Sequence, residues 1–214
     1  MKSSFIFFFI LIVSFFCKAQ VNLVPNPSFE IYDTCPDYAA SIPAYYNAIY
    51  WAIPWTQPYT PENSTDFFHS CDISVNLLGT PYNYEGFQPT HTGSGYAGLI
   101  AFQLNYREYL ETELLDSLIQ GKKYCVSFYV SFANMARIAC DGIQAYLSDT
   151  FVHYDDPQFG LLSLPAQVQN PSGNVITDTL NWVLISDTLT ALGGEKFITI
   201  GNYKDDIQTN ILQN

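Results

Sequence analysis

The sequence predicts an all-β fold, a sandwich of two antiparallel sheets. The first observation is the stretch 121–132, in which a turn signal leads into a strand with strict alternation of apolar and other residues. Its apolar face consists of Tyr124, Val126, Phe128, Val130 and Phe132. An apolar face opposite a small or polar one is typical of a strand packed against a second sheet. The second observation is that other strand-like segments follow along the chain, separated by turn signals.

The first nineteen residues, 1–19, are predicted to be an export signal. Residues 5–16 form an apolar run that follows a lysine and precedes small side chains, the pattern of a signal peptide cleaved after Ala19. The run is shorter than the roughly 20 residues that span a bilayer, so no transmembrane segment is predicted. A lipoprotein acylated at Cys17 is the alternative, but two phenylalanines stand where small residues are expected. Residues 20–214 are then a single exported domain, extracellular or associated with the outer membrane.

The predicted mature chain is strongly acidic. The sequence has 8 Lys and Arg against 20 Asp and Glu, and removal of the signal takes away Lys2 and Lys18, which leaves a net charge of −14. Phosphate binding needs clustered cations, so a nucleic-acid partner is excluded. Neutral sugars and Ca²⁺ are compatible with this composition.

Four cysteines, Cys35, Cys71, Cys125 and Cys140, follow the signal, and an exported chain can oxidise them. Cys125 and Cys140 each open one of two consecutive predicted strands. In an antiparallel hairpin they would lie at opposite ends, beyond the roughly 7 Å Cα separation that a disulfide allows. We therefore predict a disulfide between Cys35 and Cys71, which lie in loop-rich sequence, and a buried thiol at Cys125.

The predicted strands follow in order along the chain. They are 27–32, 49–55, 75–78, 96–104, 106–114, 121–132, 143–148, 181–190 and 196–202. The stretch 106–119 is ambiguous because its leucines have helical spacing, whereas Leu110, Thr112 and Leu114 also suit a strand. The neighbouring strands favour a strand that ends at Leu114.

Strand 143–148 is predicted to be the antiparallel partner of 121–132, and Gly193 and Gly194 are predicted to form a turn. The segment from 36 to 89, rich in proline and aromatic residues, is too long for an unstructured loop in a compact domain. Function is expected there, because binding residues concentrate on elaborated loops.

No sequence motif of a hydrolase, metalloprotease or nucleotide-binding protein is present, and the protein is not predicted to be an enzyme. The three histidines are isolated from one another in the sequence. Glu108, Glu111 and Glu113 could provide the two carboxylates of a glycosidase. Their spacing is more typical of a solvated strand face.

Aromatic residues supply the candidate ligand-binding site. Trp51, Trp55 and Tyr59 belong to a cluster on the proline-rich segment, where flat rings can stack on sugars. The alternative is that the two tryptophans pack against the core. Arg107, with Tyr109 close by, could hold an acidic or hydroxyl-bearing ligand, or it could be neutralised by neighbouring acids.

Six segments in order resemble the galactose-binding-like jelly-roll domains of exported Bacteroidetes proteins, found ahead of outer-membrane anchoring or type IX secretion segments. They read PNPSFE, SGYAG, REYLE, LIQGKKYCVSFYVSFA, DGIQAYLS and GGEKFITIGNY. The resemblance implies a two-sheet antiparallel jelly roll and a non-catalytic module that binds glycan or cell-surface ligands. The alternative is a structural or protein-interaction module of a larger cell-envelope or adhesion protein, with other envelope proteins as partners.

The same resemblance implies a structural Ca²⁺ site. Related carbohydrate-binding modules use a glutamate of the first strand, which is Glu30 here, and an aspartate of the final strand. The matching final-strand ending is not found before Asn214. Either the chain is truncated and lacks its last strand, or the calcium site is incomplete.

Overall fold

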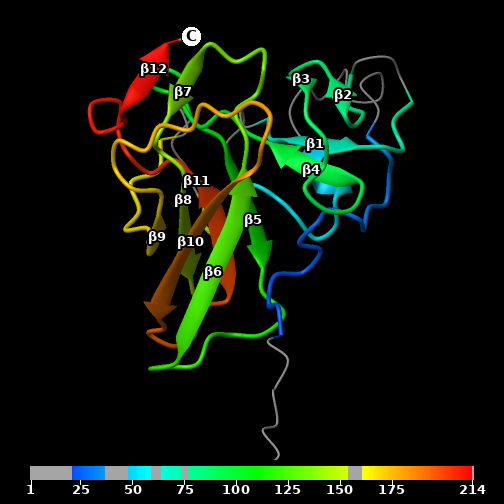
Figure 1. Cartoon of the computed structure of the whole chain (residues 1–214). Helices are drawn as coiled ribbons and strands as arrows, with labels where there is room; N and C mark the ends of the chain where they lie inside the picture. The colour runs from blue at the N-terminus through cyan, green and yellow to red at the C-terminus, as the bar shows by residue number, and fades with distance from the viewer. Residues whose placement is uncertain (1–20, 37–47, 59–63, 74–76, 154–160, 214) are drawn as a thin grey trace, which may run out of the picture.

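Two antiparallel layers form the main body of the protein (Figure 1). The computed structural model describes residues 21–36, 48–58, 64–73, 77–153 and 161–213. The front layer consists of β6 (Lys123–Val130) paired with β10 (Val183–Thr190). The back layer has the order β5 (Tyr109–Glu113), β11 (Phe197–Gly201), β8 (Gln144–Ser148) and β9 (Val168–Gln169). The described chain is therefore essentially all-β, as predicted.

Smaller elements lie beside and above these layers (Figure 1). A side unit contains the 3₁₀ helix η1 (Ala48–Trp51), the pair β1 (Asp66–His69) and β4 (Gly95–Gly98), and the hairpin of β2 (Tyr82–Asn83) and β3 (Gly86–Phe87). A further pair, β7 (Ile138–Cys140) and β12 (Ile211–Gln213), lies at the end of the molecule that carries the C-terminus. The side unit flanks β6, and this position creates the site described below.

The core lies between the two layers. Alternate residues of β6 point inward and meet Ile185 and Leu189 of β10 and Leu147 and Ile198 of the back layer. Full burial of one such aliphatic side chain stabilises the fold by about 1.5–3 kcal/mol. The period-two pattern of 121–132 thus produces the packing that the sequence predicts.

A second cluster joins the side unit to the back layer. Ile49, Trp55 and Phe67 pack on Leu110 of β5, and Thr56 forms a bridge with Glu111. The segment 49–55, predicted as a strand, is instead helical at its start and then turns. The tight turn lets Ala52 and Trp55 both reach this cluster, which an extended strand would not allow.

The strand predicted at 27–32 is also absent. Asn26 and Phe29 have φ values of 44° and 61°, and Phe29 N donates to Asn26 O at 3.2 Å, so this segment is a turn. β4 is shorter than the predicted strand 96–104. Of the predicted strand 75–78, the first two residues lie outside the described residues, and Leu77 and Leu78 are not in a strand.

The predicted pairing of 121–132 with 143–148 is wrong. β6 pairs with β10 along its whole length, from Lys123 with Thr190 to Val130 with Val183. β8 lies in the opposite layer between β11 and β9. Most residues of β8 are buried, on both faces of the strand. A strand beside β6, whose outer face is exposed, would have an exposed face as well. Gly193 and Gly194 do form the predicted turn, with φ values of 100° and 97°.

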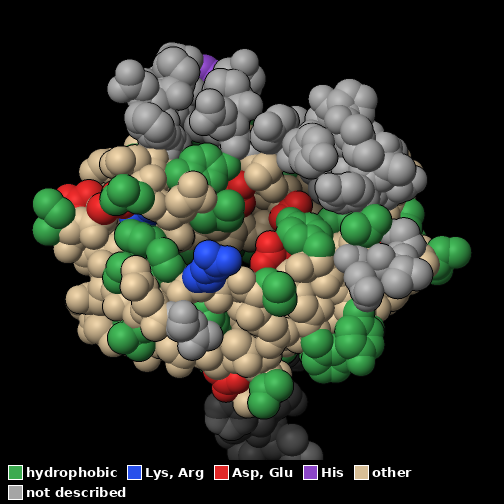
Figure 2. All heavy atoms as spheres, turned by 90° about the horizontal axis from the view of Figure 1, so that it is seen from above, with side chains coloured by type: hydrophobic (Ala, Val, Ile, Leu, Met, Phe, Trp, Pro, Cys, Tyr) green, Lys and Arg blue, Asp and Glu red, His purple; other side chains and the backbone are tan. Residues whose placement is uncertain are grey.

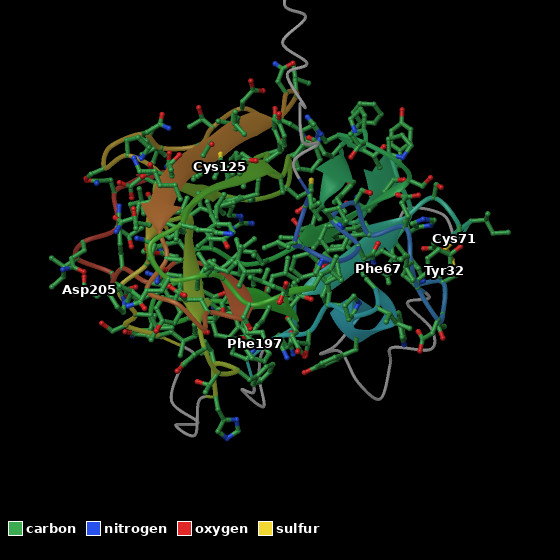
Figure 3. All side chains as sticks on the ribbon, turned by 90° about the horizontal axis from the view of Figure 1, so that it is seen from below. Tyr32, Phe67, Cys71, Cys125, Phe197 and Asp205 are labelled. Carbon is green, nitrogen blue, oxygen red and sulfur yellow. A yellow bond between two sulfur atoms is a disulfide. The ribbon has the colours of Figure 1, made fainter. Side chains whose placement is uncertain are left out.

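Of the four described cysteines, two form a disulfide and two are free thiols. Cys35 and Cys71 form the predicted disulfide, with a Cα separation of 6.0 Å. The prediction of a buried thiol at Cys125 is wrong. Cys125 lies on the outer face of β6, where no further layer covers it, whereas Cys140 is buried. Figure 3 shows Cys125 beside the front layer, far from Cys71 at the outer edge of the side unit.

Candidate functional site

A cavity of about 1000 Å³ lies beside the inner face of β6. It is lined by β6, by β4, by the β2–β3 hairpin and by residues of the segment 21–29. We call it the interlayer cavity. Its volume lies at the upper end of the roughly 300–1,000 Å³ that is usual for small-molecule sites. In the view from above, acidic side chains border a hollow in the surface, and a basic side chain lies beside them (Figure 2).

The cavity exists because the two layers differ in width. The front layer has two strands and the back layer has four, and β9 approaches β10 at one edge. At the other edge, Val126, Phe128 and Val130 of β6 are only partly buried, and all three line the cavity. Leu110 and Ile200 of the back layer line it from the opposite side. One wall of the cavity is therefore apolar.

Three aromatic rings form a second wall, and they come from β1, β4 and the β2–β3 turn. The Phe68 ring centroid lies 5.7 Å from that of Tyr84 and 5.3 Å from that of Tyr96. The Phe68 ring lies over Gly98, where a Cβ would come within 2.7 Å of Phe68 Cε2. Asn83 Nδ2 donates to Tyr96 Oη at 2.6 Å and fixes that ring.

The loop that follows β3 borders the cavity near the C-terminal end of β6. His91 stacks on Tyr129 of β6 with ring centroids 3.7 Å apart. Trp182 donates from Nε1 to the carbonyl oxygen of Pro89 at 2.9 Å, and its ring meets Tyr96 edge-on at 5.6 Å. These contacts attach the side unit to the front layer.

The polar end of the cavity contains three carboxyl groups, those of Asp66, Glu85 and Glu108. Tyr84 Oη donates a short hydrogen bond to Asp66 Oδ2. The pKa of Asp66 is raised to about 7, mainly because the group is buried. The hydrogen bond from Tyr84 lowers this pKa, and the negative charges of Glu108 and Glu85 raise it. Burial and the charge of Glu108 also raise the pKa of Glu85. Burial also raises the pKa of Tyr84, and its interactions with Asp66 raise it further.

Glu108 is held rigidly at the base of this group. Its side chain is 1 % exposed, and Oε1 accepts from Ser64 N at 3.1 Å, Ser64 Oγ at 2.5 Å and Tyr106 Oη at 2.9 Å. Oε2 accepts from Ile100 N at 2.8 Å. These hydrogen bonds hold the Glu108 carboxyl group in one orientation.

The prediction that Glu108, Glu111 and Glu113 form a solvated strand face is wrong for the first two. Glu108 and Glu111 are buried because the side unit covers one face of β5 and the segment around Val152 covers the other. Only Glu113 is exposed, and it pairs with Lys196 at 2.5 Å.

The predicted aromatic ligand residues take other positions. Trp55 is 5 % exposed, stacks on Phe29 at 5.1 Å and donates from Nε1 to Asn26 O at 2.8 Å, so it packs at the inner edge of the cavity. Trp51 is half-buried against the cluster of Ile49 and its neighbours and does not line the cavity. Tyr59 lies outside the described residues.

Arg107 and Tyr109 are fully buried and also lie away from the cavity. Arg107 forms an ion pair with Asp206 at 2.8 Å and lies 4.4 Å from the centre of the Phe102 ring. Tyr109 donates to Asn202 O at 3.0 Å and accepts from Leu162 N at 2.9 Å. Both side chains hold distant segments of the chain together.

Glu30, the predicted calcium ligand, uses its carboxylate within the protein. Its Oε1 accepts from Ser94 N at 2.6 Å and from Gly95 N at 3.3 Å. In the part of the chain that the structure describes, no group of three or more His, Cys, Asp or Glu could hold a metal ion. Ca²⁺ takes six to eight oxygen ligands, so the calcium site stays a prediction.

The sequence does not point to Asp66 and Glu85 as site residues, and it raises Glu108 only as a possible glycosidase carboxylate. Asp66, Glu85 and Glu108 lie far apart in the sequence, and the fold brings them together. The only local signal is that acids adjoin aromatic residues in DFF from Asp66 and in YEGF from Tyr84.

Comparisons with protein-family models, with curated proteins and with solved structures find no match to this chain. Among the described residues, no helix has the length and apolar character that crossing a membrane requires. The chemistry of the site therefore has to be inferred from its own geometry.

Proposed function

We propose that this protein is a non-catalytic, exported binding module that holds a glycan in the interlayer cavity. One observation carries the proposal: the cavity combines a wall of aromatic rings, Phe68, Tyr84 and Tyr96, with hydrogen-bonding groups at one end. Aromatic faces stack on the apolar faces of sugar rings, and carboxylates accept hydrogen bonds from sugar hydroxyl groups. A cavity of about 1000 Å³ has room for a short segment of a glycan chain.

The predicted export signal and the disulfide between Cys35 and Cys71 support a role outside the cytoplasm. The six segments that resemble galactose-binding-like domains support a jelly-roll topology for the two layers. In this proposal a larger cell-envelope or adhesion protein presents the module to its glycan or cell-surface ligand.

A glycoside hydrolase is the second candidate, and the observation that favours it is Asp66. A carboxyl group whose pKa is raised to about 7 beside other carboxylates is the usual arrangement of a general acid and its partner. Glu108 argues against this role, because both its oxygens are occupied by hydrogen bonds from the protein.

A glycan array followed by calorimetric titration tests the proposal. We expect saturable binding of at least one glycan, weakened about 10- to 100-fold by Glu85→Gln, because the variant loses a charged hydrogen-bond acceptor. Glu113→Gln, which changes an exposed carboxylate outside the cavity, should leave the affinity unchanged. Absence of binding to every glycan, or equal affinities in both variants, would refute the proposal. Release of sugar products from a bound glycan would favour the hydrolase.

A further inference from the structure

We propose that the ligand of the interlayer cavity carries a protonated primary amine, so that the module selects a glycan with free amino groups over its N-acetylated and neutral counterparts. This inference rests on the proposed function and names the chemical class of the glycan. Its basis is the combination of unbalanced negative charge with aromatic rings around Asp66.

The charge of the cavity is not balanced by the residues that line it. Asp66, Glu85 and Glu108 line it, whereas no Lys or Arg is found among the described lining residues. Carboxylates brought together away from water repel one another, and bringing them there is costly unless a cation or a proton neutralises them.

Two other buried or partly buried carboxylates of the protein have such a cation. Asp141 pairs with Lys204 at 3.1 Å, and Asp206 pairs with Arg107 at 2.8 Å. The cavity differs from these sites in having acids that face an open volume. A positively charged ligand group would supply the missing charge.

The aromatic residues favour an ammonium group over a metal ion as this cation. Asp66 and Phe68 lie two residues apart on β1 and therefore share one face of the strand. Tyr84 binds the Asp66 carboxyl, and its ring lies 5.7 Å from that of Phe68. Ammonium groups are attracted to the faces of aromatic rings, and they donate hydrogen bonds to carboxylates. A metal ion would be held by the carboxylates alone, whereas an ammonium group can use both the carboxylates and the ring faces.

Binding of a cation should also move a proton. The raised pKa of Asp66 reflects burial and the neighbouring charges of Glu108 and Glu85, with the Tyr84 hydroxyl as its hydrogen-bond partner. An ammonium group close to Asp66 stabilises the ionised carboxylate and lowers its pKa. At pH 6.5 part of the Asp66 population is protonated, so Asp66 should release protons on binding, whereas any ligand amine that is unprotonated in solution takes up a proton. Titration in buffers of different ionisation enthalpy measures the net change, which Asp66→Asn should shift toward uptake.

The test compares three matched tetrasaccharides on the full exported chain at pH 6.5 and about 0.15 M salt, where long-range attraction to the acidic surface is screened. They are a glucosamine tetramer, its fully N-acetylated form and a glucose tetramer. We expect the amine form to bind at least tenfold more tightly than the other two. Asp66→Asn and Glu85→Gln should each reduce this preference to about twofold or less, and Glu113→Gln should keep it. Two cavity variants are used so that misfolding of one leaves the test intact.

The other outcomes separate the two proposals. Equal binding of all three tetramers would overturn the amine inference and leave the binding module standing. No binding of these three, together with an empty glycan array, would refute both. A preference for the amine form that Glu113→Gln reduces as much as Asp66→Asn does would show attraction to the overall negative charge, and the inference would be wrong.

Discussion

Glu111 is a buried carboxyl group with no cation beside it among the described residues, and its replacement by glutamine should stabilise the protein at neutral and alkaline pH. The side chain is 0 % exposed, and its Oε1 accepts from Thr199 Oγ1 at 3.0 Å and from Val152 N at 2.9 Å. Its Oε2 has no hydrogen-bond partner in the described structure. Burial, only partly offset by the bonds from Val152 and Thr199, raises the pKa of Glu111 to about 7.

The size of the effect follows from this pKa. The difference between about 7 and the usual 4.5, at about 1.4 kcal/mol for each pH unit, amounts to about 3 kcal/mol. Between pH 4.5 and 7 the folded protein keeps the proton while the unfolded chain loses it, so this residue lowers stability as the pH rises. Glu111→Gln retains the shape of the protonated group and removes the charge. It should match the parent protein below pH 4.5 and exceed it by up to about 3 kcal/mol above pH 7.

Urea unfolding of both proteins at several pH values between 4 and 8.5 measures this difference, and the titration of all other groups cancels in the comparison. Glu113→Gln on the same strand is the control, because an exposed ion pair such as that of Glu113 with Lys196 contributes only about 0–1 kcal/mol. A stability difference for Glu111→Gln that does not change with pH, or a loss of stability at pH 8, would refute the reasoning.

Two other predictions concern a buried ion pair and the thiols. Asp141 accepts from Asn210 N at 3.0 Å and pairs with Lys204 at 3.1 Å; burial raises its pKa, but hydrogen bonds from Asn210 and other groups outweigh burial and lower it. Asp141→Asn should therefore lower the free energy of unfolding by about 3 kcal/mol at pH 7, measured by urea unfolding. This loss should shrink as the pH falls below about 3.8, where the carboxylate becomes protonated. An equal loss at all pH values would contradict this prediction. A thiol alkylating reagent should modify exposed Cys125 in the folded protein and buried Cys140 only in denaturant, and mass spectrometry that finds both modified at equal rates would disprove the assignment.

Some local features of this fold, such as β6, could be predicted from the sequence, whereas others, such as the turns at 27–32 and 49–55, and the long-range pairing could not. The alternation in 121–132 is a property of neighbouring residues, and it identifies β6 and its inward face correctly. It does not say which strand lies alongside. The sequence favours the nearest candidate in the chain, 143–148, yet β6 pairs with β10. The place of a strand within a sheet depends on how much of it is buried by the rest of the fold, and β8 is mostly buried. The same limit explains Cys125, since alternation separates two faces without showing whether another layer covers the outer one.

The candidate site shows a similar division. Residue type marks Trp55 and Arg107 as able to bind ligands, but the same groups serve equally well in packing and ion pairing, as they do here. The cavity arises because β1, the β2–β3 hairpin and the residue before β5 meet beside the edge of β6. Asp66, Glu85 and Glu108 have no regular spacing that could reveal this meeting.

The pairing of β6 with β10 determines when the molecule can fold as it is synthesised. β6 is complete at Val130, and the first residue of its partner, Val183, follows about fifty residues later, which at about 5–20 residues per second is several seconds of translation. β5 waits even longer, since Tyr109 pairs with Gly201. During this interval the apolar residues of β6 have no partner strand, and such non-local pairing also makes folding slow. The nascent chain is therefore most prone to aggregate after β6 has emerged and before β10 and β11 are complete.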